Sequence, residues 1–295
     1  MGTQNRAEGQ AANTVKVVTD SVACLPPDLT RAHGIHLIPV RISVAGRTYS
    51  DTVEELPPDL VDAFRLAPID TTPWPPEHYA RIYSDIASDH AFIVHVVAFS
   101  RFTSTMSLAQ EGAVLARERH PGLRIEIVDS GATGMAQGFV ALAAARAAQA
   151  GAPIHVCSQA AREMAERVTS LFALESLDHV ARTGRVTRLA AWARSLLRVT
   201  PVVKLSDGME QPLFLARSRT RALERIVDLI TAGPGEEVAV HAAVMESEPS
   251  GDGERLVRLL QQNAALAECH LVQFTPVMRI VGGPGVLGVA FYSGE

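Results

Sequence analysis

The side chains of this sequence that could carry chemistry are mainly hydroxyl groups, gathered in two loops. Thr71 and Thr72 lie in a loop that several prolines stiffen. Ser100 and Thr103–Thr105 follow an apolar segment and precede a helical pattern. Hydroxyls together with the free N–H groups of a helix N-terminus can hold a carboxylate or a phosphate. The same threonines could instead simply cap the helix that follows, and their spacing leaves both interpretations open.

A bound anion also calls for a countercharge, and one loop arginine could supply it. Arg185 follows Gly184 in a short polar loop. An isolated loop arginine is usually a solvated surface residue, so its position alone leaves the choice open. Arg185 is therefore a candidate anion ligand.

Two serines suggest an alternative, which is nucleophilic catalysis by a stand-alone hydrolase. Ser21 and Ser100 each lie just after an apolar run, and the neighbouring Asp20 and Asp129 could orient a base. A serine nucleophile needs a general base within hydrogen-bond reach, and no histidine is placed by sequence next to either serine. This alternative depends on what the fold brings together.

The usual cofactor and metal motifs are absent from the sequence. It contains no Walker loop, no H-E-x-x-H and no G-x-S-x-G. Gly283–Gly288 spells G-x-G-x-x-G, but Pro284 lies inside it and no helix follows, so the segment predicts a tight turn. His95 and His241 lie within apolar strands, which is typical of core histidines. We expect no metal and no cofactor.

Composition excludes several other classes of protein. The chain has 295 residues, of which 47% are hydrophobic and 20% charged, as in a globular protein with a large core. A formal net charge of −5 predicts no nucleic-acid partner and at most transient contact with a membrane. No apolar segment reaches the roughly 20 residues that span a bilayer. The 3 cysteines are far apart and resemble free thiols, so we expect a cytoplasmic protein.

The first half of the chain alternates strand and helix patterns. Short β-branched apolar runs predict strands, and the Ala-rich segment Met135–Ala150 predicts a long helix. Such alternation is typical of a mainly parallel sheet covered by helices on both faces. Ligands bind beyond the carboxyl ends of these strands, where the polar clusters Thr19-Asp20-Ser21, Ser100–Thr105 and Asp129-Ser130-Gly131 fall. The predicted strands are Val15–Thr19, Ile35–Ser43, Phe92–Val97 and Ile125–Val128.

The second half changes pattern after Gly151-Ala152-Pro153. Asp207-Gly208 between two apolar runs predicts a hairpin, because glycine adopts positive φ without steric cost. The remaining pattern predicts a mixed, largely antiparallel α/β domain. Its predicted strands are Thr169–Leu174, Pro201–Leu205, Met209–Leu215, Val238–Val244, His270–Phe274 and Val286–Phe291, with helices ending near Ile230 and spanning Arg255–Ala267.

These patterns predict an α/β protein of two domains. A polar tail over residues 1–13 precedes an N-terminal three-layer α/β/α domain over residues 14–152. A C-terminal, largely antiparallel α/β domain follows over residues 153–295.

A series of short motifs along almost the whole chain resembles the DegV family. The opening strand ends in T-D-S, as the family's first strand does, and further matches follow in the family's order. The matching segments are Val15–Ser21, Ile35–Pro39, Tyr49-Ser50-Asp51, Thr71-Thr72, Phe99–Thr105, Asp129-Ser130 with Gly138, Thr183-Gly184-Arg185, Arg217, His241-Ala242 and Gly283-Pro284-Gly285.

The resemblance implies a ligand and its contacts. Family members hold a long-chain fatty acid between two α/β domains, with the carboxylate at the domain junction and the acyl chain enclosed. Matched residue by residue, the head group would meet Thr71, Ser100 and Arg185, with Thr72 and Thr103 beside them. A dozen buried methylenes would contribute on the order of 10 kcal/mol before association costs.

The resemblance also implies a partner. The best understood family members are binding subunits of a fatty-acid kinase, which present the carboxylate to a separate ATP-binding subunit that makes an acyl phosphate. The missing Walker loop agrees with a subunit that binds no ATP and is not itself an enzyme.

Several positions depart from the family pattern. Val281 stands where the H-x-G-P-G loop has its histidine, and Phe99 stands at the first serine of the S-S-x-L-S-G-T segment. Thr103 and Ser104 replace the third serine and the glycine of that segment. A lipid carrier or sensor without a kinase partner is therefore a further alternative.

Overall fold

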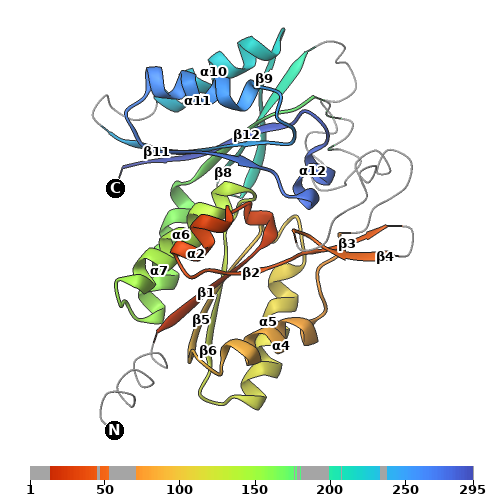
Figure 1. Cartoon of the computed structure of the whole chain (residues 1–295), viewed down its shortest axis with the longest axis vertical. Helices are drawn as coiled ribbons and strands as arrows, with labels where there is room; N and C mark the ends of the chain where they lie inside the picture. Colours follow the sequence, from red (N-terminus) through yellow and green to blue (C-terminus); the bar gives the residue numbers. More distant parts are fainter. Residues whose placement is uncertain are drawn as a thin grey trace.

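The computed structural model describes residues 14–44, 47–52, 71–175, 177, 180, 199–206, 208–232 and 238–294. These residues form two lobes, each built around its own sheet (Figure 1). The N-terminal lobe holds a four-stranded sheet and the C-terminal lobe a six-stranded one. The α/β class with a parallel first sheet and a mostly antiparallel second sheet is confirmed.

The first sheet is parallel and has the strand order β2-β1-β5-β6. Its apolar strands are buried on both faces, which is why they read as continuous β-branched runs rather than alternating ones. The strands are β1 (Val15–Asp20), β2 (His36–Ile38), β5 (Phe92–Val97) and β6 (Arg124–Asp129).

The predicted single strand Ile35–Ser43 is divided in the structure. Only β2 joins the parallel sheet, and after Pro39 the chain continues as β3 (Arg41–Val44), which pairs with β4 (Arg47–Ser50) in a separate hairpin. Proline has no N–H to donate to a ladder, so a strand through this position loses a hydrogen bond and ends.

Helices cover both faces of the first sheet. Val17 and Val94 pack into the cluster that contains α6 and α7, whereas Val18 and Ile93 pack into the cluster of α4 and α5. Neighbouring residues of a strand therefore face opposite layers, as the pleat requires. The elements are η1 (Ser21–Ala23), α2 (Pro27–Ala32), α4 (Pro76–Ile86), α5 (Thr105–Arg119), α6 (Met135–Gln149) and α7 (Ile154–Arg167).

The second sheet has the order β11-β10-β12-β7-β8-β9. Its pairs are antiparallel except β10 with β11, which run parallel. The predicted hairpin joins β8 to β9, and Gly208 has the positive φ of 61° that the turn requires. The strands are β7 (Thr169–Ala173), β8 (Thr200–Ser206), β9 (Met209–Ala216), β10 (Val240–Glu246), β11 (Leu266–Gln273) and β12 (Leu287–Ser293).

The two faces of the second sheet have different neighbours. Two helices, α10 (Arg219–Thr231) and α11 (Asp252–Asn263), cover the outer face, at the top of Figure 1. The inner face packs on α6 of the first lobe, where Phe139 and Tyr292 stack edge to face with ring centroids 5.1 Å apart. The short helix α12 (Pro276–Gly282) lies where the lobes meet (Figure 1).

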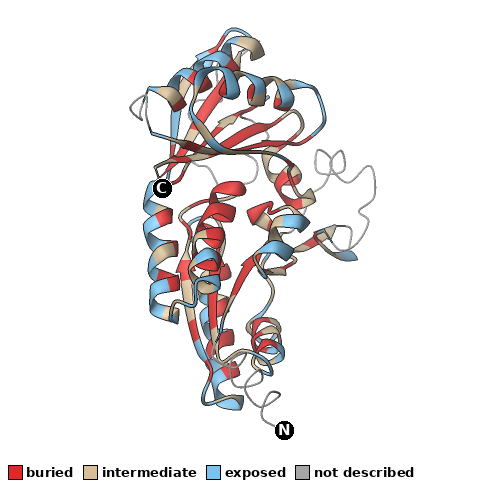
Figure 2. Cartoon of the chain, turned by 60° about the vertical axis from the view of Figure 1, so that its left-hand side comes forward, coloured by how far each residue is buried: buried red, intermediate tan, exposed pale blue. Residues whose placement is uncertain are grey.

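One continuous apolar core therefore joins the lobes. Buried residues, drawn red in Figure 2, run from the first sheet through α6 to β10 and β12. Helix α7, which follows residue 153, packs on β5 and β6 of the first sheet. The division of the chain at that residue stays a prediction.

Candidate functional site

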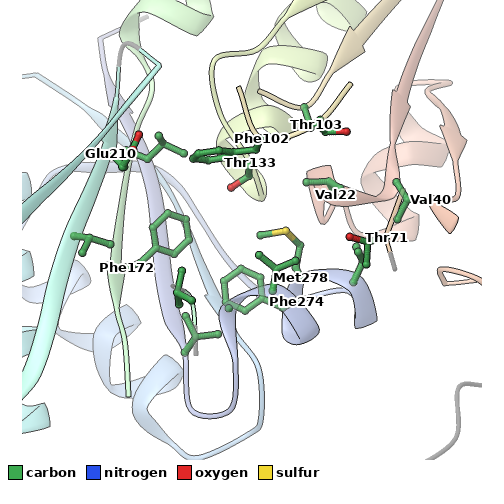
Figure 3. Close-up of a pocket in the computed structure, with 18 of the residues that line it drawn as sticks. Val22, Val40, Thr71, Phe102, Thr103, Thr133, Phe172, Glu210, Phe274 and Met278 are labelled. Atoms are coloured by element: carbon green, nitrogen blue, oxygen red, sulfur yellow. The ribbon is translucent and has the colours of Figure 1, made fainter. Parts of the chain in front are cut away.

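A cavity lies between the two lobes. Its volume, taken as the space open to the centres of water-sized spheres, is about 150 Å³. Most of the side chains that line it are apolar, and several of them appear in Figure 3. The apolar lining comes from Val22, Val40, Pro73, Ala98, Phe102, Phe172, Leu174, Val180, Val203, Leu205, Phe274, Val277, Met278, Val281 and Val286.

The cavity is built from the carboxyl edge of the first sheet and the inner face of the second. Val22, Val40 and Ala98 follow β1, β2 and β5, at the edge where ligands of parallel sheets bind. Phe172 on β7 and Leu205 on β8 face them from the other lobe. The sequence predicted this edge as the place of the site.

Four threonines add hydroxyl groups to the lining: Thr71, Thr103, Thr105 and Thr133. Thr103 and Thr105 are hydrogen-bonded to each other, with 2.9 Å between their hydroxyl oxygens. The backbone N–H of Thr105, at the start of α5, also donates to the Thr103 hydroxyl. Thr103 therefore lines the cavity and also accepts a hydrogen bond at the first turn of α5, while its role as an anion ligand stays a prediction.

The structure separates the other residues predicted as ligands. Thr72 is exposed, and its carbonyl accepts a hydrogen bond from Arg41 Nε. Ser100 is also exposed, and its N–H donates to the carboxylate of Asp129. Neither residue lines the cavity. Arg185 lies outside the described residues.

The sequence interpretation missed three polar residues of the cavity, Thr133, Lys204 and Glu210. Thr133 lies just beyond β6, next to the Asp129-Ser130 motif, so its place after a parallel strand was a usable signal. Glu210 lies on β9 and is only 5% exposed. Nothing local marks it, because its direction depends on the register of the β8–β9 hairpin.

A buried carboxylate supports the loops around the cavity. Asp20, at the end of β1, accepts hydrogen bonds from the Gln137 side chain and from the N–H groups of Val22 and Ala98. Burial raises the pKa of Asp20 from its ordinary 3.8 to about 6, although these hydrogen bonds oppose the rise. Its acceptor oxygens hold in place the two loops that carry cavity residues 22 and 98.

A second buried carboxylate joins the lobes. Asp51 accepts a hydrogen bond of 2.6 Å from the Ser21 hydroxyl and one of 3.1 Å from the N–H of Val277 on α12. Ser21 in turn accepts from the N–H of Val40. Burial raises the pKa of Asp51, and the bonds from Ser21 and Val277 oppose that rise. This network fixes one wall of the cavity.

The same contacts bear on the hydrolase alternative. The Ser21 hydroxyl is fully buried and engaged with Asp51, and the Asp129 carboxylate accepts from the backbone N–H groups of Ser100 and Gly131. Within the described part of the chain, no histidine hydrogen-bonds to Ser21 or Ser100. Among the residues that the structure describes, neither serine therefore has a histidine partner that could act as its general base.

The remaining sequence predictions concern a core histidine, a glycine-rich turn, metal ligands and membrane spans. His95 is buried and lies 2.6 Å from the Tyr83 hydroxyl through Nδ1, as expected for a core histidine. Gly283–Gly285 forms the turn between α12 and β12, with φ of 86° at Gly283 and 64° at Gly285. The described residues contain no cluster of three or more potential metal ligands and no helix long and apolar enough to cross a membrane.

The fold and the cavity define a class, a two-lobed α/β protein with a mainly apolar cavity at the lobe junction. Residues 14–294 match the sequence model of the family described as "Uncharacterised protein, DegV family". The chain belongs to the DegV family.

Relatives and solved structures agree with this assignment. A DegV domain-containing protein of Streptomyces coelicolor is 30% identical over 283 residues, which cover 95% of this chain and 98% of that protein. The structure of a DegV family protein from Thermus thermophilus, described with fatty-acid binding, superposes with a TM-score of 0.86 at 24% identity and covers 95% of this chain and 99% of that one. The fatty-acid-binding DegV of Bacillus subtilis gives a TM-score of 0.81 at 24% identity, with coverage of 95% and 99%.

Proposed function

We propose that this protein binds a long-chain fatty acid in the cavity between its lobes. The observation that carries the proposal is a mainly apolar cavity at the lobe junction with a few hydroxyl groups in its wall. Each methylene buried there contributes about 0.8 kcal/mol, and a single carboxylate needs only a few donors to offset its desolvation. Solved structures of DegV proteins described with fatty-acid binding share this fold.

The carboxylate of the ligand lies near Thr71 and Thr103. Both residues line the cavity, whereas the residues that follow them, Thr72 and Ser104, are exposed, so this end of the cavity is close to the surface. Val281 also lines the cavity and offers no donor where the family motif has a histidine. Hydroxyl donors therefore take a larger share of the head-group contacts in this chain.

Arg185 remains our candidate for the countercharge. A guanidinium hydrogen-bonded to a carboxylate is worth about 1.5–3 kcal/mol, more than one neutral hydroxyl supplies. We expect Arg185→Gln to weaken fatty-acid binding by about tenfold or more. Equal affinity of wild type and variant by isothermal calorimetry would remove Arg185 from the site.

Native mass spectrometry of the purified protein tests the function directly. We expect an adduct with the mass of an acyl chain, which organic extraction removes and added oleate or palmitate restores. Calorimetry on the extracted protein should then give one site per chain. A protein that is repeatedly empty and has no measurable affinity for either acid would contradict the proposal.

Matched hydroxyl deletions locate the carboxylate. Thr71→Val and Thr103→Val keep side-chain shape but remove a donor from the cavity wall, so each should weaken binding by about threefold to tenfold. Thr72→Val and Ser100→Ala make the same kind of change outside the lining and test the ligand roles predicted from sequence. If Thr72→Val and Ser100→Ala weaken binding as much as the first pair or more, the carboxylate does not lie at Thr71 and Thr103.

We further propose that the bound acid is presented to a separate ATP-binding kinase subunit. The support is the family resemblance together with a polar end of the cavity close to the surface. A mixture of the acyl-loaded protein, the ATP-binding subunit of a bacterial fatty-acid kinase and ATP should yield an acyl phosphate, trapped as a hydroxamate. If the protein still binds fatty acid but no acyl phosphate forms, the result would favour the alternative of a lipid carrier or sensor without a kinase partner.

A further inference from the structure

One acidic side chain of the cavity has no role in holding a carboxylate. Glu210 lines the cavity and is only 5% exposed. On the β8–β9 hairpin it pairs with Leu205, which lines the cavity as well. Residues paired across two strands point to the same face of a sheet, so the Glu210 side chain is directed into the apolar space.

The Glu210 carboxyl group has no partner among the described residues. Its Oε2 atom is fully buried without a hydrogen bond, and no described side chain forms an ion pair with it. The nearest lysine along the hairpin, Lys204, also contributes to the cavity lining, but no ion pair joins it to Glu210. Buried polar groups are almost always hydrogen-bonded, so an unpartnered carboxyl facing a cavity indicates a donor that the ligand brings.

The position of Glu210 excludes the ligand's own carboxylate as its partner. Figure 3 draws Glu210 on one side of the cavity and Thr71 on the other, with Phe102 and Thr133 between them in this view. Two carboxylates at close range repel each other, so the ligand's charged end is driven toward the hydroxyl side. Glu210 then meets the hydrocarbon part of the ligand.

We propose that the preferred ligand is a hydroxylated fatty acid, whose chain hydroxyl donates a hydrogen bond to Glu210. The inference rests on the proposed function and names the class of acid within it. A plain hydrocarbon chain covers Glu210 without offering a donor, which leaves the carboxyl desolvated and unpaired. A hydroxyl on the chain removes that cost and adds a hydrogen bond to the carboxyl group.

Calorimetry with a matched panel of ligands tests the proposal on the wild-type protein. The panel contains octadecanoic acid and octadecanoic acids that carry one hydroxyl at successive carbons from the carboxylate to the methyl end. We expect one position or a few adjacent positions away from the carboxylate to bind about tenfold more tightly than the plain acid. Hydroxyls elsewhere on the chain should bind more weakly than the plain acid, because they are buried without a partner.

Variants of Glu210 identify the group responsible. Glu210→Met removes the acceptor, so the preference should disappear and the plain acid should bind more tightly. Glu210→Gln keeps one acceptor oxygen and should retain a reduced preference. Gln211→Met makes a comparable change on the exposed face of the same strand and should leave the panel unchanged.

The outcomes separate the inference from the function beneath it. Binding of the plain acid at least as tight as that of every hydroxylated isomer overturns the inference and leaves fatty-acid binding intact. A preference that survives in Glu210→Met overturns the role of Glu210. Failure of the wild-type protein to bind any member of the panel overturns both.

Discussion

The titration of Asp20 offers a quantitative test of how the cavity loops are held. This carboxyl is 2% exposed, and burial raises its pKa from 3.8 to about 6 despite hydrogen bonds from Gln137, Val22 and Ala98. A raised pKa means that the folded protein binds the proton more tightly than the unfolded chain does. The stability that Asp20 contributes is therefore fully present below pH 3.8 and is lost as the pH rises through about 6.

The size of the effect follows from the two pKa values. Their difference, about 6 minus 3.8, multiplied by about 1.4 kcal/mol per pH unit, gives about 3 kcal/mol. The perturbation is Asp20→Asn, which removes the titration. The free energy of unfolding of wild type minus that of the variant should rise by about 3 kcal/mol as the pH falls from 7 to below 4. Any constant cost of the asparagine cancels in this pH dependence.

Urea unfolding of both proteins at a series of pH values measures this difference. An NMR titration of the Asp20 carboxyl carbon in the wild type supplies an independent midpoint and needs no folded variant. A stability difference that falls as the pH falls, or a midpoint below 3.8, would refute the reasoning. Either result would mean that the three donors outweigh the cost of burying the charge.

Three further substitutions test local packing, each by urea unfolding. Gly112→Ala should destabilise the protein by about 1–3 kcal/mol, because the added Cβ would lie 2.7 Å from the backbone oxygen of Pro76 in helix α4. The control Gly122→Ala has nothing within 4 Å of its added Cβ and should leave stability unchanged or slightly raised. Equal effects of the two substitutions would contradict this prediction. Ser218→Ala removes the side-chain cap of α10 and should cost about 1 kcal/mol, and no loss would mean that the cap is replaced. Tyr83→Phe leaves the buried His95 without its 2.6 Å partner and should cost about 1–3 kcal/mol; a neutral result would show that the contact is dispensable.

Most of the secondary structure could be predicted from local patterns. Phe92–Val97 forms β5 with the predicted bounds, and the predicted helix from Met135 forms α6. These signals are local, since β-branched runs and alanine-rich periodicity act over a few residues. The prediction was wrong between Ile35 and Ser43, where Pro39 interrupts the ladder, although the proline was visible in the sequence.

The sequence predicted the edge of the first sheet at which the cavity lies, but not which loop side chains line that cavity. The polar clusters after the parallel strands indicated the edge of the first sheet at which the cavity lies, and Thr71 and Thr103 are among the residues that line this cavity. Thr72 and Ser100 belong to the same clusters but are exposed. A residue's type and its distance from a strand do not determine which way its side chain turns in a loop.

The sequence alone determines most of the elements that form, and that polar side chains gather beyond the strands of one sheet, because these properties depend on neighbours within a few positions. The cavity itself, the contact of Asp51 with Val277, and the inward direction of Glu210 depend on the packing of segments far apart in the chain. Such packing is set by the combined burial of many side chains. The direction of a single side chain at the lobe junction can therefore be determined only once both lobes are folded together.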